Sequence, residues 1–397
     1  MAGATNRRAH SGPLGATMLA AAVLFSVAGQ AAWAGRAWQP GLGKILNTRD
    51  GGQIFGFDID QHGDDGVLAS AQTIDADGDV RVSVETFDQD TGEITKSFAR
   101  YTGKKHEYSM DGIFAGDAAL ITHYVTPKGT IYAKRFYKLM NPVTAQQFTG
   151  DWVPPIKDVD VLQGAMNQDT STSVLYAIAL KKQDKPVLFV GDIAANTFSN
   201  VIHLDPNLFS LSNGPHLGQY IAANKAVIAL SPDGGKVGGA APVNALIDLD
   251  TEKIATFNGY NNGTFHAGYV NGLAVDPNTG VAATTTELNS QVEFYDMQHK
   301  KGITAVQLPC TDNTDQVNSG SNIAVDPLNK LFLVTDTFYC DGSQGSAIVV
   351  YDEEGNFVES ITGFGFFIGE PAPAINPSKR MGWAFGPGFS QLQQFFY

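Results

Sequence analysis

Three histidines occupy corresponding positions in the chain and are the side chains best suited to chemistry near neutral pH. His106, His216 and His266 each precede a β-rich run that we expect to be the innermost strand of a repeat. Imidazole titrates near neutral pH and is a common ligand of transition metals. We predict that these residues converge to bind a ligand or transfer protons; the alternative is that each is solvated or hydrogen-bonded to backbone.

The two cysteines of the chain are predicted to form a disulfide. Cys310 follows an expected outer strand, and Cys340 lies between the second and third strands of the next repeat, so both would lie on one loop face. An oxidising compartment permits such a bond, and two free thiols are the alternative. A metal or redox centre is disfavoured because the sequence has no second pair and no Cys-x-x-Cys motif.

Alternate aspartates in a short loop provide a further candidate. Asp75, Asp77 and Asp79 surround Gly78, which resembles part of a Ca²⁺ loop. A plain Asp-Gly hairpin turn accounts for the same residues. The sequence contains none of the Gly-x-Ser-x-Gly, Walker-type or His-Glu-x-x-His catalytic motifs. Whether the protein is an enzyme is therefore open, and the absence of a local motif favours a non-catalytic role.

These residues would be positioned by a repeat of 50 residues. The phrase Gly272-Leu-Ala-Val-Asp-Pro277 returns as Asn322-Ile-Ala-Val-Asp-Pro327 and again as Ala372-Pro-Ala-Ile-Asn-Pro377. Repeats of 20 to 50 residues are typical of solenoids and propellers. Each period holds four short β-rich runs bounded by Gly, Asn, Asp and Pro, which is the composition of one four-stranded propeller blade.

We predict an all-β, seven-bladed β-propeller, with six blades as the alternative. The segment from Glu370 to Tyr397 has room for only three strands. An open sheet edge would expose unpaired backbone groups. The run Lys44-Ile-Leu-Asn-Thr48 is therefore expected to supply the fourth strand, so that both ends of the chain build the last blade.

The first 34 residues are expected to be a secretory signal peptide. Arg7 and Arg8 precede an apolar run from Ala16 to Ala28, and Ala32-Trp-Ala34 matches a small-x-small cleavage signal. We therefore expect one propeller domain over residues 35–397, secreted or periplasmic, monomeric, and without an integral membrane span. Removing two arginines changes the formal charge from −14 to −16, which disfavours nucleic acid as a partner.

The phrase Asn271-Gly-Leu-Ala-Val-Asp-Pro277, followed by a strand and a Tyr-Asp hairpin, resembles the repeats of NHL and YncE-type propellers and, more distantly, of the SMP-30/gluconolactonase group. The resemblance covers about 130 C-terminal residues well. In the lactonase group, an Asn before such a Gly and a Glu before a Pro bind a divalent cation. The resemblance thus implies that Asn271 and Glu370 bind Ca²⁺ or another divalent cation. The Ser321-Asn322 pair departs from that pattern, and the further ligands have no clear counterparts.

Two functions follow as expectations. The first is a propeller that binds an unidentified small molecule or protein through its loop face and central channel and requires no cofactor. The alternative is a lactonase or other hydrolase that depends on a divalent metal at the channel mouth. The two hypotheses differ in whether several oxygen or nitrogen ligands converge on one point.

Overall fold

The repeated Asp-Pro phrase forms a tight turn that is held by the oxygen of its own acidic side chain. Asp276 Oδ1 accepts hydrogen bonds from the backbone N–H groups of Asn278 at 2.7 Å and Thr279 at 3.0 Å. Asp326 Oδ1 accepts one from the backbone N–H of Asn329 at 2.8 Å. Asp and Asn favour such turns because their short side chains can bond to the backbone two or three residues later. The sequence repeat is thus a turn that ends one strand and starts the next.

A computed structural model describes most of the chain from Pro40 onwards. The described residues are 40–61, 63–73, 79–104, 112–115, 118–125, 134–140, 147–152, 161–166, 174–181, 185–192, 197–206, 209, 216–230, 243–258, 270–286, 291–308, 319–340, 343–365, 372–385 and 390–397.

The described residues form seven antiparallel sheets of four strands. Six of these sheets are built from four consecutive strands. They are β2 to β5 (Gln53–Ile59, Asp65–Thr73, Asp79–Asp88, Ile94–Lys104), β6 to β9 (Gly112–Ala115, Ala118–Val125, Lys134–Met140, Gln147–Trp152), β10 to β13 (Val161–Met166, Val174–Lys181, Lys185–Asp192, Thr197–His203), β14 to β17 (His216–Tyr220, Lys225–Leu230, Val243–Asp248, Ile254–Asn258), β18 to β21 (Val270–Val275, Val281–Thr286, Gln291–Asp296, Lys301–Gln307) and β22 to β25 (Ser319–Asp326, Leu331–Cys340, Ser343–Asp352, Phe357–Thr362).

The remaining sheet combines strands from opposite ends of the chain. Its order is β1 (Gly41–Asn47), β28 (Gln391–Phe396), β27 (Met381–Phe385) and β26 (Ala374–Asn376). Leu46 of β1 lies opposite Leu392 of β28 in antiparallel register. The backbone N–H of Lys44 also donates to Gln394 Oε1 at 3.1 Å. The first and last described strands are therefore hydrogen-bonded neighbours, 350 residues apart in the chain.

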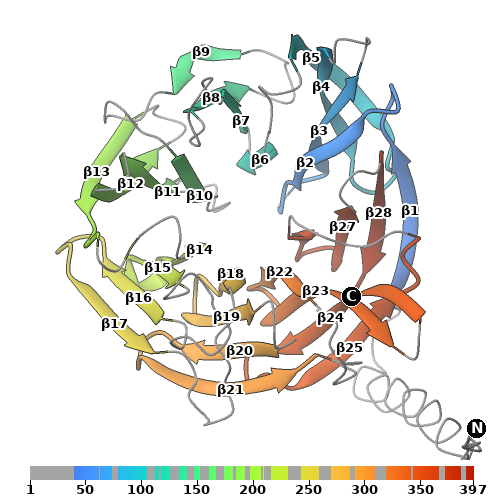
Figure 1. Cartoon of the computed structure of the whole chain (residues 1–397). Helices are drawn as coiled ribbons and strands as arrows, with labels where there is room; N and C mark the ends of the chain where they lie inside the picture. The colour runs from blue at the N-terminus through green and yellow to red at the C-terminus, as the bar shows by residue number, and fades with distance from the viewer. Residues whose placement is uncertain are drawn as a thin grey trace, which may run out of the picture. The chain divides into compact units, whose positions relative to one another are not determined.

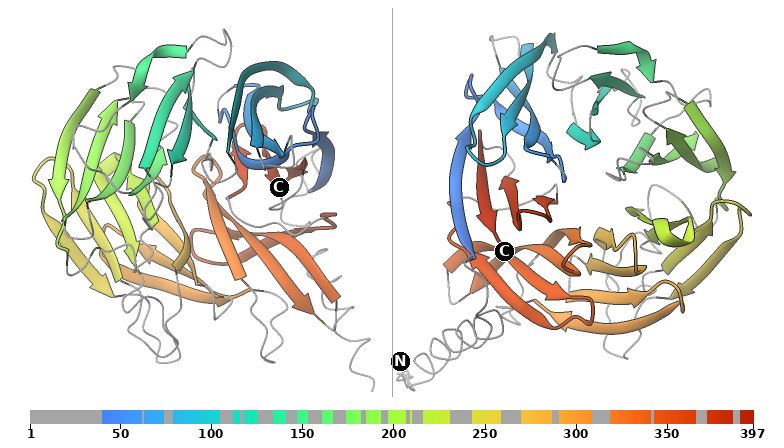
Figure 2. Two further views of the ribbon diagram at one scale, coloured as in Figure 1. Left: turned by 45° about the horizontal axis from the view of Figure 1, so that its top comes forward. Right: turned by 180° about the vertical axis from the view of Figure 1, so that it is seen from behind.

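The sheets of residues 40–397 follow one another around a common centre (Figure 1). The first strand is innermost in the six consecutive sheets, and β26 is innermost in the sheet that contains β1. Contacts between neighbouring innermost strands link β2 with β6, β10 with β14, β14 with β18, β18 with β22, β22 with β26, and β26 with β2. The views in Figure 2 show the same order of sheets from other directions. These innermost strands therefore lie next to the common centre.

Apolar side chains fill the space between neighbouring sheets. Phe294 of β20 contacts Phe332 of β23 edge to face, with ring centroids 5.6 Å apart. Leu331 to Val334 are all buried, because the second strand of a sheet is covered on both faces. This explains why the second strands read as continuous apolar runs and not as alternating patterns.

Residues 40–397 form one compact unit by themselves. Within the part of the chain that the structure describes, no helix has the length and hydropathy needed to cross a membrane. The all-β class predicted from the sequence is confirmed.

Candidate functional site

Polar side chains lie on three consecutive innermost strands, and we call this region the inner-strand wall. It is defined by His216 on β14, Asn271 on β18 and Asn322 on β22, all half-buried. The strands β14 and β18, and β18 and β22, are in contact. The wall thus brings together two residues singled out in the sequence, His216 and Asn271, and adds a third.

His216 is the first residue of its strand, and its ring is hydrogen-bonded to the backbone of Val270 on the next innermost strand. Burial lowers the pKa of His216, and the hydrogen bond to Val270 only partly opposes this effect. The imidazole is therefore neutral at physiological pH. A neutral imidazole has one donor and one acceptor nitrogen.

Gly272 allows β18 and β22 to approach closely beside Asn271. A Cβ atom at this position would lie 2.9 Å from Asn322 Cα and 3.2 Å from both Asn322 Oδ1 and Thr285 Oγ1. The first of these distances is shorter than real Cβ contacts. The glycine of the repeated phrase is thus required by packing against the next sheet.

Asn322 lies at an irregularity in β22, where the register with β23 shifts between Gly320 and Ile323. Its backbone N–H donates to Thr335 Oγ1 at 3.0 Å, and the Thr335 hydroxyl donates back to the Asn322 carbonyl at 3.1 Å. The irregularity is therefore anchored at its backbone. Such bulges redirect side chains and often lie beside functional sites.

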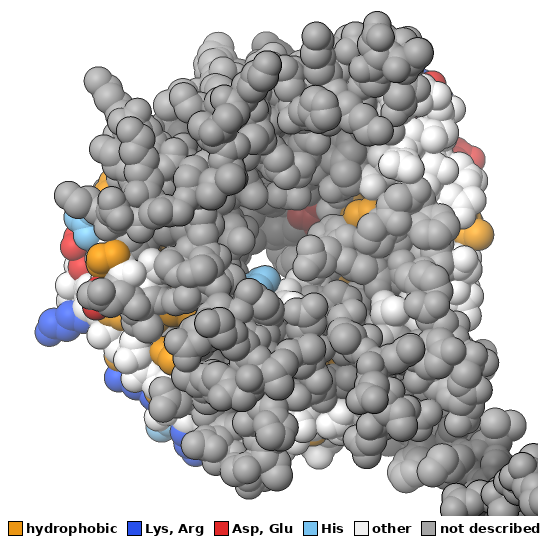
Figure 3. All heavy atoms as spheres, viewed as in Figure 1, with side chains coloured by type: hydrophobic (Ala, Val, Ile, Leu, Met, Phe, Trp, Pro, Cys, Tyr) orange, Lys and Arg blue, Asp and Glu red, His pale blue; other side chains and the backbone are white. Residues whose placement is uncertain are grey.

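The space-filling view shows a hollow at the centre of the sheets, with a histidine side chain at its edge (Figure 3). Among the described residues, no three His, Cys, Asp or Glu side chains gather in an arrangement suited to a metal ion. The polar groups of the inner-strand wall are instead uncharged. They can donate hydrogen bonds to a ligand and accept them from it.

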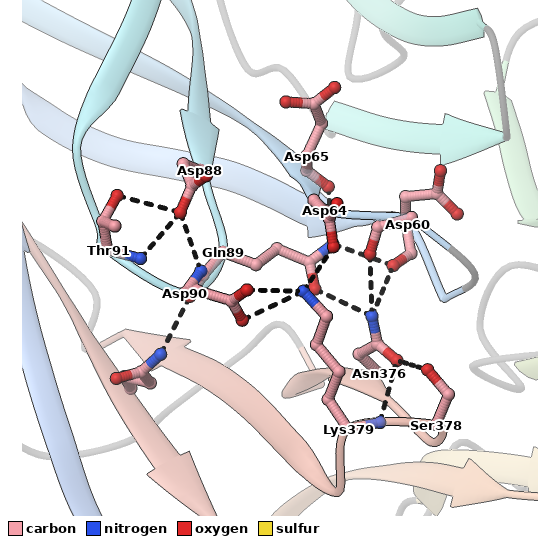
Figure 4. A network of polar contacts seen from close by, with 12 residues as sticks. Asp60, Asp64, Asp65, Asp88, Gln89, Asp90, Thr91, Asn376, Ser378 and Lys379 are labelled. Carbon is pink, nitrogen blue, oxygen red and sulfur yellow. Dashed lines mark hydrogen bonds and ion pairs between the residues drawn. The ribbon is translucent and has the colours of Figure 1, made fainter.

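A second polar cluster lies between the sheet of β1 and β26 to β28 and the sheet β2 to β5, and we call it the terminal junction (Figure 4). Gln89 is fully buried there, and its Nε2 donates to the carbonyls of Asp60 at 2.8 Å and Asp65 at 2.7 Å. Asn376 Nδ2 donates to Gln89 Oε1 at 3.0 Å, and Gln394 Nε2 donates to the Gln89 carbonyl at 2.8 Å. Buried amides with all these partners fix the position of one sheet against the next.

One lysine accompanies several aspartates at the exposed side of the terminal junction (Figure 4). Lys379 Nζ lies 2.6 Å from Asp64 Oδ1 and 2.9 Å from Asp90 Oδ1. Burial acts to lower the pKa of Lys379, but the hydrogen bonds to Asp64 and Asp90 outweigh it and raise the pKa. Burial and repulsion from Asp60 and other aspartates raise the pKa of Asp65. The lysine thus balances part of an acidic cluster.

Several residues predicted from the sequence lie outside the described part of the chain. These are Asp75, Asp77, His106, His266, Cys310 and Glu370. Cys340 is the last residue of β23, at the end of a long hairpin with β24. The convergence of the three histidines, the metal pair Asn271 with Glu370, and the disulfide from Cys310 to Cys340 stay predictions.

Comparison with known proteins identifies the class of fold. No protein-family model matches the sequence, and a search of curated proteins also gives no match. Among solved structures, U3-55K is similar over 89% of this chain and 98% of its own, with a TM-score of 0.57 and 11% sequence identity. The Cps50 (Swd1) beta-propeller domain of Myceliophteria thermophila is similar over 90% of this chain and 100% of its own, with a TM-score of 0.54 and 12% identity.

The Dos1 propeller is a third similar structure, with a TM-score of 0.54 and 11% identity over 90% of this chain and 95% of its own. The chain therefore has the β-propeller fold. At these identities the similarity shows the fold alone. The closer resemblance to NHL, YncE-type or SMP-30 repeats stays a hypothesis.

Asn322, Gln89 and Lys379 were not predicted as site residues. The sequence does carry a signal for the terminal junction, because the third copy of the phrase has Asn376 where the other two have Asp276 and Asp326. An amide can donate a hydrogen bond where a carboxylate cannot. Asn322 has no comparable signal, since only the packing of β18 against β22 brings it to Gly272.

Proposed function

We propose that this β-propeller is a binding protein whose inner-strand wall recognises uncharged polar groups of a small molecule or of a peptide segment. The observation that carries the proposal is the hydrogen bond of neutral His216 to the Val270 backbone, directly beside Asn271. It supports a wall in which one imidazole nitrogen is held by the Val270 backbone, while the other nitrogen can accept a hydrogen bond from a ligand. The amides of Asn271 and Asn322 add donors and acceptors.

The scaffold of this proposal is a closed ring of seven blades. The seven four-stranded sheets among the described residues, the pairing of β1 with β28 and the contact of β26 with β2 support it. The last blade would then be completed by β1, the first described strand. A closed ring protects the short inner edges of the blades and holds the innermost strands at fixed spacing around the ligand.

We further propose export of the protein as a monomer after removal of residues 1–34, with a disulfide from Cys310 to Cys340 on the loop face. N-terminal sequencing of the exported protein tests the cleavage site after Ala34. Mass spectrometry of a non-reduced digest tests the disulfide. A peptide pair that carries both cysteines supports it, and two singly alkylated peptides contradict it.

The binding proposal is tested by thermal shift of the purified mature protein with neutral sugars, amino-acid amides and short uncharged peptides. A ligand of the native state raises the melting temperature in proportion to the logarithm of its excess over Kd. We expect the shift to vanish in His216→Ala and Asn322→Ala. It should persist in Lys301→Ala, which changes an exposed residue on the outer strand β21.

The same preparation distinguishes binding from the metal-dependent lactonase alternative. Elemental analysis and unfolding with and without a chelator report a resident divalent cation. A stoichiometric metal that is lost in Asn271→Ala and Glu370→Gln, together with lactone hydrolysis, would replace the binding proposal by the lactonase. Ligand shifts that survive His216→Ala and Asn322→Ala would also overturn the proposed wall.

A further inference from the structure

A carboxyl group without a hydrogen bond at one of its oxygens is buried between the sheets β18 to β21 and β22 to β25. Asp336 on β23 is 1% exposed, and its Oδ1 has no hydrogen-bond partner in the structure. It lies on the same face of β23 as Phe332 and Val334, which pack in one cluster with Phe294 of the neighbouring sheet. Burial of an ionised carboxylate is costly unless it is paired or bonded.

Among the described residues, the groups around Asp336 do not supply a counter-charge. On β19, Thr285 lies on the same face as Ala283, which packs in the cluster of Phe332 and Val334. Thr285 is fully buried, and its Oγ1 also lacks a hydrogen bond. On β20, Glu293 lies on the opposite face, the one that carries Tyr295 towards β14 to β17. The described residues of β18 include no titratable group.

On its own sheet, the titratable group near Asp336 is the phenol of Tyr351, and the carboxylate of Asp326 is more distant. Tyr351 on β24 lies in the same cluster, and burial together with the charge of Asp336 raises its pKa. Asp326 stands at the opposite end of β22. Burial alone raises the pKa of Asp336 to about 7, so its carboxyl group stays protonated up to about neutral pH.

Asp336 adjoins the irregularity that carries Asn322. It lies opposite Gly320 in the register of β22 and β23, immediately before the register shift. Asn322, within that shift, packs on Gly272 of β18. A change at Asp336 therefore acts on the segment that joins β22 to the inner-strand wall.

We propose that this junction is a proton-linked device, in which loss of the Asp336 proton loosens the contact between β18 and β22 and so alters the inner-strand wall. Ionisation leaves a charge without a partner among apolar side chains, and local opening admits water to it. The proposal adds regulation to the proposed binding role and in that sense rests on it. The test of the proton-linked device needs no ligand, so this proposal and the binding proposal can fail separately.

The direction of the pH effect follows from the raised pKa. The closed junction binds the proton more tightly than the open one, so the stabilisation is complete below the pKa of an exposed aspartate, near 4. This stabilisation is lost as the pH rises to about 7, and above that value the stability of the closed junction no longer changes with pH. Over this window, the equilibrium constant for opening should rise by up to about tenfold per pH unit.

Hydrogen exchange followed by mass spectrometry measures this opening in the full-length mature protein. After correction for the intrinsic pH dependence of exchange, protection of β18 and β22 should fall by up to about tenfold per pH unit between about pH 5 and 7. In Asp336→Asn the protection should not change with pH. A pH response in Asp336→Asn equal to that of the wild type would overturn the proposal.

Glu359→Gln is the matched control. Burial also raises the pKa of Glu359 to about 7, but this residue is on the outer strand β25 and interacts with Arg380. We expect Glu359→Gln to keep the pH response of β18 and β22. If Asp336→Asn does not fold, infrared titration of Glu359→Gln tests the proposal instead. We expect an absorption band of a protonated carboxyl group that disappears near neutral pH. Absence of this band at about pH 6 would refute the proposal.

Discussion

Asn376 and Gln89 are 287 residues apart in the chain, yet Asn376 Nδ2 donates a hydrogen bond of 3.0 Å to Gln89 Oε1. The same amide nitrogen donates to the carbonyls of Asp60 at 3.2 Å and Gly63 at 3.0 Å. The acceptor oxygen of Asn376 meanwhile holds its own turn through the Ser378 hydroxyl at 2.7 Å. One side chain thus closes its turn and attaches it to the first sheet.

Asn376→Asp should destabilise the protein although Asp is the residue found in the other two copies of the phrase. The carboxylate keeps the turn contact but loses the donor, and it then faces three acceptor oxygens inside the junction. We expect a loss of about 2–3 kcal/mol in the free energy of unfolding, measured by urea denaturation. Asn278→Asp, at an exposed position of the first copy, should change it by less than about 0.5 kcal/mol. Equal losses in both variants would contradict the role of the Asn376 amide.

Lys379→Met tests the charged side of the terminal junction. The partners Asp64 and Asp90 are largely exposed, so the ion pairs should contribute no more than about 1 kcal/mol at low salt. Loss of the lysine also leaves neighbouring aspartates unbalanced, and salt screens their repulsion. We therefore expect a lower melting temperature at low salt and a difference close to zero at about 1 M salt. A deficit independent of salt would indicate that the aliphatic stem of Lys379 matters more than its charge.

Gly272→Ala should disturb the inner-strand wall. The added methyl group would collide with the Asn322 backbone, which cannot move without shifting β22. We expect a destabilisation of about 1–3 kcal/mol by denaturation and faster hydrogen exchange in β22. Gly365→Ala is the control, because a Cβ there meets no atom within 4 Å. A stable Gly272→Ala variant with normal exchange would show that β18 and β22 are not tightly packed.

Glu359→Gln should stabilise the protein at alkaline pH. Burial raises the pKa of Glu359 to about 7, with Arg380 acting in the opposite direction. A raised carboxyl pKa means that the folded state holds the proton more tightly, so the stabilisation present at acidic pH is lost as the pH rises to about 7. The glutamine removes this loss, and we expect a gain of about 1 kcal/mol at about pH 8 that shrinks by pH 5. Chemical denaturation at both pH values measures it, and a gain that does not depend on pH would contradict this account.

The architecture could be predicted from the sequence because propeller repeats carry local signals. The turns at Pro277, Pro327 and Pro377 are set by the residue before each proline, and the buried second strands are visible as apolar runs. The segment expected to pair with the C-terminal strand, Lys44–Thr48, overlaps β1, which begins three residues earlier and ends one residue earlier. The presence of a strand can be predicted from its composition, whereas the residues at which it begins and ends depend on the strand that pairs with it.

The site was less predictable because it depends on contacts between sheets. His216 was found by its position before an inner strand, and Asn271 by the resemblance of its phrase. Asp336 was not found, since a single acidic residue at the end of an apolar run resembles the start of a loop. Only the packing of the sheet β22 to β25 against the sheet β18 to β21 shows that its carboxyl group is enclosed. Pairs brought together by the neighbouring sheet leave no pattern in the order of residues.

The pairing of β1 with β28 has a consequence for biosynthesis. At about 5–20 residues per second, the ribosome needs roughly 20–70 s to make the 350 residues that separate Lys44 from Gln394. Throughout that time β1 lacks its partner strand β28, and Leu46, buried in the finished protein, lacks Leu392, which lies opposite it in the register. The nascent chain therefore exposes an unpaired, aggregation-prone strand from the start of its synthesis. A chaperone that binds this strand would determine the yield of folded protein.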